Sequence, residues 1–309
     1  MSKHVFVFPG QGSQYPGMGL DLAENFALAR ETFAEADDAL NFKISKLCFT
    51  GPEEDLRLTT NTQPAILTTS IAAFRVMSAE TGLKPAFLAG HSLGEYSALV
   101  AAGALGFADA VRTVRARGAF MQEAVPVGVG AMAAVLGVEA EILLEICAEA
   151  SQGEVVSPAN FNSPGQIVIA GHTGAVGRAL EIARARGFRK AMLLPVSAPF
   201  HCALMQPAGE RLTDALAAIA IAPLQQPVVT NVEAQPNADR DRVKELLVRQ
   251  VSSPVRWEES VLKMIELGGE RFVEIGPGKV LAGLIKRIVK GTDACSIEDV
   301  ASMKSFQTL

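Results

Sequence analysis

One stretch decides the fold class: residues 85–103 read PAFLAGHSLGEYSALVAAG. Residues 85–89 form an apolar run typical of a buried strand, and residues 95–102 have the composition of a helix. Between them stands Gly90-His91-Ser92-Leu93-Gly94, the Gly-x-Ser-x-Gly pattern in the strand–turn–helix setting of a nucleophile elbow. The two glycines give a sharp turn the room it needs. The sequence therefore predicts that Ser92 is exposed at the tip of the turn, facing the free N–H groups of the following helix.

Strand-like and helix-like runs alternate along much of the chain, which predicts an α/β fold with a largely parallel sheet. Residues 5–8 form a buried-strand run that ends in a glycine-rich turn, residues 9–14. From about residue 292 the sequence indicates a loose tail. The expected helices of this part are 22–40, 63–76, 107–122, 204–220, 240–250, 260–267 and 279–290, and the further strands are 228–231 and 271–275.

The middle of the chain has a different pattern. Its expected order of elements is β-α-β-β-α-β, which is typical of a ferredoxin-like unit. Prolines at 126, 195 and 199 bound this segment. We therefore predict an inserted α+β small domain of residues 127–197 and a large domain of residues 1–126 and 198–309. The expected strands of the small domain are 129–136, 155–161, 166–170 and 190–194, and its helices are 139–150 and 175–186.

Composition narrows the class of protein. A chain of 309 residues is long enough for two domains, and 49% hydrophobic with 20% charged residues is typical of a globular enzyme. A net charge of −5 argues against nucleic-acid binding. No stretch predicts a membrane span or a signal peptide. The cysteines show no C-x-x-C pair, so we expect reduced thiols, no metal site and a cytoplasmic location. They are Cys48, Cys147, Cys202 and Cys295.

A serine hydroxyl needs a base at neutral pH, and histidine is the usual one. The chain offers His4, His91, His172 and His201. We favour His201 because it follows Ser197-Ala198-Pro199-Phe200, where the chain returns to the large domain in a loop above the sheet. From spacing alone, a loop histidine that only caps a helix is an equal alternative.

The group that would orient His201 is open. In α/β-hydrolases an Asp or Glu stands between the serine and the histidine in chain order. Here the best carboxylate candidates are Asp109 and Asp214, and neither is expected at a strand end. A backbone carbonyl is therefore the other possibility.

Eight stretches, in this order and at these spacings, carry a resemblance to a known family. The chain resembles the malonyl-CoA:acyl-carrier-protein transacylases of bacterial fatty acid synthesis. The stretches are Phe8-Pro9-Gly10-Gln11-Gly12-Ser13-Gln14, Thr62-Gln63-Pro64-Ala65, Gly90-His91-Ser92-Leu93-Gly94-Glu95-Tyr96, Arg117-Gly118 with Met121-Gln122, Asn160-Phe161-Asn162-Ser163-Pro164-Gly165-Gln166, Phe200-His201, Ser253-Pro254-Val255-Arg256-Trp257 and Glu274-Ile275-Gly276-Pro277-Gly278-Lys279.

The resemblance implies an α/β-hydrolase-like large domain interrupted by a ferredoxin-like small domain. It implies that Ser92 is the acyl nucleophile and that His201 is the base and acid. The main-chain carbonyl of Gln250 would orient the histidine, which accounts for the missing carboxylate. The N–H groups of Gln11 and Leu93 would form the oxyanion hole, and the glycine-rich turn around Gln11 suits backbone donors near an anion.

The same resemblance implies that Arg117 binds the free carboxylate of a malonyl group. An arginine fork matches a carboxylate in a bidentate pair. On a helical wheel, Arg115 and Arg117 both flank the apolar stripe of residues 107–122, so the wheel does not choose between them. A solvated helix face is the simpler alternative for either. The amide candidates for lining the cleft are Gln63, Asn160, Asn162 and Gln166, although such side chains more often satisfy the backbone of turns.

The expected activity is ping-pong transfer of malonyl from coenzyme A to the phosphopantetheine thiol of acyl carrier protein, with no metal or organic cofactor. Two basic runs, residues 178–190 and 279–290, would suit coenzyme A phosphates and an acidic carrier. The alternatives are a trans-acting acyltransferase of a polyketide pathway, a serine thioesterase or esterase on the same elbow, and a catalytically silent docking module.

Overall fold

The structure, a computed structural model, describes residues 3–196 and 198–307. The strands of its larger sheet are β1 (His4–Phe8), β2 (Phe87–Gly90), β7 (Val228–Val229), β8 (Pro236–Asn237), β10 (Arg271–Ile275) and β11 (Asp293–Ile297). They are ordered β11-β10-β1-β2-β7-β8, and every neighbouring pair is parallel except β7 with β8. The predicted α/β fold with a largely parallel sheet is confirmed.

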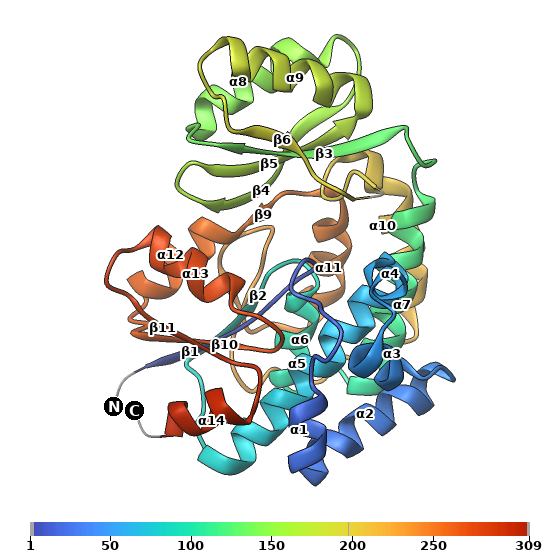
Figure 1. Ribbon diagram of the computed structural model, residues 1–309, viewed down its shortest axis with the longest axis vertical. Coiled ribbons are helices and arrows are strands. Elements are labelled where there is room, and N and C mark those ends of the chain that lie inside the picture. Colours follow the sequence, from blue (N-terminus) through green and yellow to red (C-terminus); the bar gives the residue numbers. More distant parts are fainter. Residues whose placement is uncertain (1–2, 197, 308–309) are drawn as a thin grey trace.

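Helices cover both faces of this sheet (Figure 1). Alternate residues of β1 point to opposite faces, so Phe6 and Phe8 join one core and Val5 and Val7 join the other. The second core is packed by α12 (Trp257–Glu266) and α13 (Val280–Ile288). The first is packed by α1 (Leu20–Asn25), α2 (Ala27–Leu40), α3 (Ile44–Thr50), α4 (Glu53–Arg57), α5 (Thr59–Thr81), α6 (Gly94–Ala101), α7 (Phe107–Glu123), α10 (Gln206–Ala217), α11 (Val243–Ser252) and α14 (Val300–Gln307).

The smaller sheet lies above the larger one in Figure 1. Its strands are β3 (Gly130–Leu136), β4 (Val156–Ser163), β5 (Gln166–His172), β6 (Ala191–Leu193) and β9 (Val255–Arg256), in the order β6-β3-β5-β4-β9. Helices α8 (Ala140–Ser151) and α9 (Thr173–Ala185) cover its outer face. On β5, Ile167 and Ile169 join the core under these helices, whereas Val168 and Ala170 join the core of the larger sheet. Along the chain, residues 130–193 follow the predicted β-α-β-β-α-β order.

Two expectations for local structure are wrong. The chain end is not a loose tail: β11 pairs in parallel with β10, and α14 buries Met303 and Phe306. Residues 293–297 are weakly apolar, and their strand is stabilised by pairing with β10. The expected helix 22–40 is two helices, because the backbone of Phe26 is extended, with φ −125°.

The smaller sheet also takes a strand from outside the predicted small domain, because β9 pairs with β4 in parallel. The domain boundaries at 126/127 and 197/198 stay a prediction, and residue 197 lies outside the described residues. The expected helices 204–220 and 240–250 each begin with a short 3₁₀ turn, Ala203–Met205 and Arg240–Arg242. In the described part of the chain, no helix is both long and apolar enough to span a bilayer.

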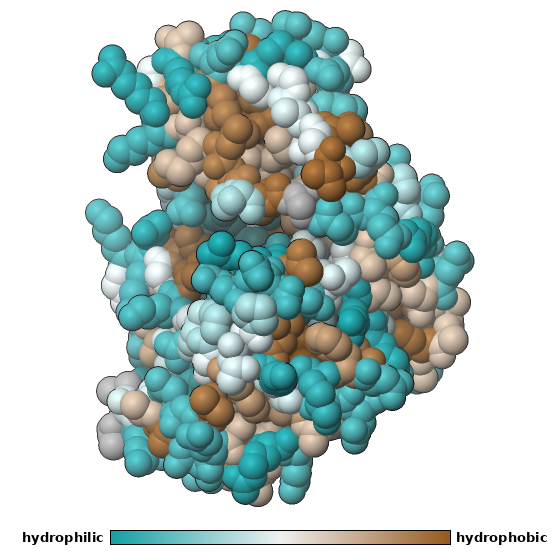
Figure 2. Space-filling view, turned by 45° about the vertical axis from the view of Figure 1, so that its right-hand side comes forward, coloured by the Kyte–Doolittle hydropathy of each residue, from teal (hydrophilic) through white to brown (hydrophobic). Residues whose placement is uncertain are grey.

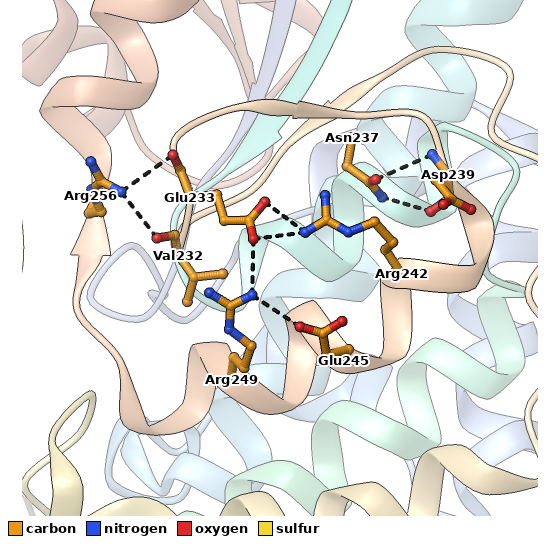
Figure 3. A network of polar contacts seen from close by, with 8 residues as sticks. All are labelled: Val232, Glu233, Asn237, Asp239, Arg242, Glu245, Arg249 and Arg256. Atoms are coloured by element: carbon orange, nitrogen blue, oxygen red, sulfur yellow. Dashed lines mark hydrogen bonds and ion pairs between the residues drawn. The ribbon is translucent and has the colours of Figure 1, made fainter.

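A network of arginines ties the loop after β7 to helix α11 (Figure 3). The Glu233 carboxylate accepts hydrogen bonds from Arg242 at 2.8 and 3.0 Å and from Arg249 at 2.9 Å. Burial raises the pKa of Glu233, but the bonds from Arg249 and Arg242 outweigh it and leave the pKa below its usual value. From β9, Arg256 donates to two carbonyls of the same loop at 3.4 Å. The loop is therefore anchored on both sides.

Candidate active site

Ser92 occupies the turn between β2 and α6, where the sequence predicts the elbow. Its φ of +51° lies in the left-handed region that few non-glycine residues adopt. The flanking glycines allow this turn to pack directly on its neighbours. A Cβ added to Gly90 would lie 1.9 Å from the carbonyl carbon of Gly94, and one added to Gly94 would lie 2.1 Å from the carbonyl oxygen of Phe8. Neither position has room for a side chain.

His201 reaches the serine from the loop before α10. Its Nε2 lies 2.7 Å from Ser92 Oγ, and its Nδ1 lies 2.9 Å from the main-chain oxygen of Gln250. A carbonyl oxygen only accepts, so Nδ1 carries the proton and the Nε2 lone pair faces the serine hydroxyl. This is the tautomer that can remove a proton from Ser92. His201 also has positive φ, +62°.

The Gln250 carbonyl is available because of its place in α11. This helix ends at Ser252, and the last four carbonyls of an α-helix have no partner within the helix. Gln250 is fully buried and His201 is 4% exposed, so the bond between them is shielded from solvent. The two carboxylates considered from the sequence lie elsewhere. Asp109 pairs with Arg112 at 2.7 Å, and Asp214 is exposed on α10.

The environment keeps His201 uncharged. Burial, together with the positive charge of Arg117, lowers its pKa to about 3. The Gln250 carbonyl opposes both effects. The imidazole is therefore neutral at neutral pH and can accept a proton from Ser92.

Asn231 holds the elbow in place, although the sequence does not predict it as a site residue. Its Oδ1 accepts the N–H of Ser92 at 2.6 Å, and its Nδ2 donates to the carbonyl of Gly90 at 2.7 Å. Asn231 is 1% exposed and follows β7, in the loop that the arginine network anchors. The side chain thus holds both ends of the strained turn. Its position at the end of the expected strand 228–231 is the one signal in the sequence, and an asparagine there is also an ordinary turn residue.

Arg117 lies at the base of the same site and is 1% exposed. Its Nη1 donates to Gln63 Oε1 at 2.8 Å, and its Nη2 donates to Gln250 Oε1 at 2.9 Å and to Ser92 Oγ at 3.1 Å. All three are uncharged, and within the described residues no carboxylate pairs directly with the guanidinium, so an anionic ligand can neutralise its charge. The sequence predicts Gln63 as a cleft residue, and the structure adds its bond to Arg117.

The helix places the neighbouring arginines elsewhere. Arg115 is partly buried and stacks its guanidinium 4.4 Å from the ring centroid of Phe42. Arg112 is exposed and pairs with Asp109. The helical wheel does not decide between Arg115 and Arg117, but packing does, because Arg117 hydrogen-bonds Ser92 and Arg115 stacks on Phe42.

A cavity of about 130 Å³ opens beside the serine, and Figure 2 shows the surface hollowed between the two sheets. Gln11 and Leu93 both line it. Within the described residues, neither of their backbone N–H groups donates to a protein acceptor. Both are therefore available to a ligand, as an oxyanion hole requires. The complete lining is Gln11, Gln63, His91, Ser92, Leu93, Arg117, Met121, Met132, Asn160, Leu194, Val196, Phe200 and His201.

The other three histidines make no hydrogen bond to the Ser92 hydroxyl within the described residues. His91 Nε2 lies 2.9 Å from Asn162 Oδ1, and burial lowers the pKa of His91. His172 accepts the N–H of Val155 at 3.0 Å, far along the smaller sheet. His4 begins β1. The arrangement as a whole is a hydroxyl with a neutral base in reach, free backbone donors and a buried cation, which suits nucleophilic attack on an acyl group that carries a negative charge.

Known proteins resemble the chain over nearly its full length. Malonyl CoA-acyl carrier protein transacylase from Escherichia coli (strain K12) is 51% identical over 303 residues, which is 98% of each chain. The crystal structure of an acyl carrier protein S-malonyltransferase from Vibrio cholerae superposes with a TM-score of 0.96, at 51% identity, over 99% of this chain and all of that one.

A second solved structure shows a type II PKS acyl-carrier protein in complex with its malonyl-transacylase. It has a TM-score of 0.96 and 48% identity, and covers 98% of each chain. The family model for the acyl transferase domain matches residues 5–308. With this match, and with relatives of this identity and coverage, the chain belongs to the acyl transferase family, among the malonyl CoA-acyl carrier protein transacylases.

Proposed function

We propose that this protein transfers a malonyl group from coenzyme A to the phosphopantetheine thiol of acyl carrier protein, through a malonyl ester on Ser92. One observation carries the proposal. The Ser92–His201–Gln250 chain of hydrogen bonds stands beside the buried guanidinium of Arg117, whose partners are all neutral. The nucleophile suits any acyl thioester, and the cation selects an acyl group with a carboxylate.

In the first half-reaction, Ser92 Oγ attacks the thioester carbon while its proton passes to Nε2 of His201. The N–H groups of Gln11 and Leu93 hold the oxyanion that forms. The carbon–sulfur bond then breaks, and the leaving thiolate takes the proton from His201. The carbonyl of Gln250 keeps the imidazole in the tautomer that both proton transfers require.

In the second half-reaction, His201 takes the proton of the carrier thiol, and the thiolate attacks the malonyl ester. The ester bond breaks, and Ser92 regains its proton from His201. A hydrolase would use water at this step instead, so a transferase must keep the ester from water until the thiol arrives. The burial of His201, 4% exposed, supports such protection.

The basic residues of α13 are the better of the two candidate surfaces for an acidic carrier. Arg287 donates to Gln166 at 2.9 Å. Gln166 lines a second cavity of about 160 Å³, which shares Gln11 and His91 with the first. Along residues 178–190, by contrast, acidic neighbours already neutralise part of the charge: Arg178 pairs with Glu154, and Arg186 pairs with Glu145 and Glu149.

Intact-mass measurement after exposure to malonyl-CoA tests the proposal. We expect the mass of one malonyl group on the wild-type chain, none on Ser92→Ala, and loss of the label when carrier protein with its phosphopantetheine arm is added. A wild-type chain that stays unlabelled while malonyl-CoA is consumed would contradict the ester intermediate. Malonyl-CoA consumption that does not depend on the carrier would favour a thioesterase.

A polyketide pathway is the second candidate setting, because a relative of 48% identity is a malonyl-transacylase in complex with a type II PKS carrier. The chemistry at Ser92 would be the same. Rates with carrier proteins of the two kinds, measured side by side, separate the two settings.

In either setting, we place the reaction in the cytoplasm. The free state of the four cysteines, three of them buried, supports this location.

A further inference from the structure

Glu95, a buried carboxylate, lies behind the reacting serine and takes no part in the mechanism above. It is 1% exposed and belongs to the first turn of α6. Its Oε2 accepts two hydrogen bonds, from the backbone N–H of Asn231 at 2.9 Å and from Nε2 of Gln250 at 2.8 Å. Both donors are neutral. Burial raises the pKa of Glu95 to about 7, although these bonds and the charge of Arg117 act in the opposite direction.

The partner of Glu95, the Gln250 side chain, has two unlike ends. Its Nε2 donates to Glu95 and to the carbonyl of Ser92 at 2.9 Å, and its Oε1 accepts from Arg117 at 2.9 Å. Oε2 of Glu95 faces two N–H donors, so this oxygen acts as an acceptor toward Gln250 whether or not the other carboxyl oxygen carries a proton. Glu95, together with the Ser92 carbonyl, therefore turns the NH₂ end of the amide toward these two acceptors and the oxygen toward Arg117.

The position of Arg117 depends on this choice. Of its two amide acceptors, Gln63 binds Nη1 and Gln250 binds Nη2, the nitrogen that also reaches Ser92 Oγ. A reversed Gln250 amide would point its NH₂ group at the guanidinium, and two donors would then face each other. Arg117 would move, and the carboxylate-binding fork would leave its place beside the nucleophile.

We infer that Glu95 is a positioning residue for acyl selectivity: it fixes the Gln250 amide, which in turn holds Arg117 in place for a carboxylate-bearing acyl group. The inference rests on the proposed function and deepens it. Glu95 acts through Gln250, and within the described residues its carboxylate makes no hydrogen bond to Ser92 Oγ or His201. Its effect therefore falls on the selection of the acyl group more than on the proton transfers.

The test compares kcat/KM for malonyl-CoA and acetyl-CoA in four chains: wild type, Glu95→Ala, Glu95→Leu and Glu95→Gln. Leucine is close to glutamate in size and leaves a smaller cavity than alanine. Glutamine keeps an oxygen that can accept from Asn231 and Gln250. We expect the malonyl-to-acetyl preference to fall roughly ten- to hundredfold in the alanine and leucine variants, the cost of one charge-assisted hydrogen bond. Glutamine should restore it to within about threefold, since it keeps both acceptor bonds.

Gln250→Leu provides the second measurement. If Glu95 acts through the amide, Glu95→Leu should change the preference by less than about twofold in a chain that already carries Gln250→Leu. An equal loss for both acyl groups, or additive effects in the double variant, would overturn the inference. Failure of both the leucine and the alanine variants to fold, judged by circular dichroism, would also overturn it, because it would assign Glu95 to stability. A wild-type chain that does not form a malonyl ester would instead count against the proposed function.

Discussion

Truncation of Arg117 gives the sharpest test of the site, because it separates two acyl groups that differ by one carboxylate. In Arg117→Ala, the malonyl carboxylate loses its cation, whereas acetyl has nothing to lose there. The guanidinium is 1% exposed, so water cannot replace it without cost.

The magnitude follows from this burial. Removing one partner of a buried, hydrogen-bonded charge pair costs about 2–5 kcal/mol. At about 1.4 kcal/mol per factor of ten, kcat/KM for malonyl-CoA should fall roughly 30- to 5000-fold. For acetyl-CoA the variant loses only the bond from Arg117 to Ser92 Oγ, and at 3.1 Å this bond is near the long end of the usual range, so we expect a change of about tenfold.

The assay is the rate of CoA release with each thioester at saturating carrier protein. Arg115→Ala is the matched control, since it removes the same side chain two residues away, where the guanidinium stacks on Phe42 at 4.4 Å. We expect that control to stay within about threefold of wild type for both substrates. A parallel loss for malonyl and acetyl in Arg117→Ala, or the same loss in Arg115→Ala, would refute a carboxylate site at Arg117.

Three further predictions follow from other contacts. Asn231→Ala leaves the N–H of Ser92 and the carbonyl of Gly90 without the partners that now bind them at 2.6 and 2.7 Å. Urea denaturation should therefore show a loss of about 2–6 kcal/mol in the free energy of unfolding, and a loss below about 1 kcal/mol would contradict the role of Asn231 in holding the turn. The pKa of His201 is about 3 in the folded chain, below its ordinary value of 6.5, so the unfolded chain binds more protons between these values and stability falls as pH is lowered through that range. The stability advantage of wild type over His201→Gln should therefore shrink from pH 7 to pH 5 by up to about 1.4 kcal/mol per pH unit below pH 6.5, and a constant difference would argue against a buried neutral imidazole. Lys286→Glu, on the exposed face of α13, should slow transfer to carrier protein about tenfold at low salt and much less at high salt, whereas a salt-independent effect would exclude steering by this helix.

The elbow could be predicted from the sequence because its geometry is local. Gly90 and Gly94 are needed where the turn meets its own backbone and β1, and a short window contains that requirement. The same holds for β1 and for the β-α-β-β-α-β order of residues 130–193, since alternation along the chain reports each element. The prediction of a loose tail from about residue 292 is wrong because β11 is stabilised by pairing with β10 more than by its own composition, and a short window of sequence does not contain that pairing.

The partners of Ser92 belong to the tertiary structure. His201 lies 109 residues away, and from spacing alone it was no better than an even choice. The Gln250 carbonyl carries no sequence signal, because every residue has one, and its role follows from the end of α11 reaching the histidine. Asn231 and Glu95 are ordinary residues in the sequence. Only the fold buries them against the turn, where an unpaired polar group is costly, and burial is what gives their hydrogen bonds the strength to hold the site.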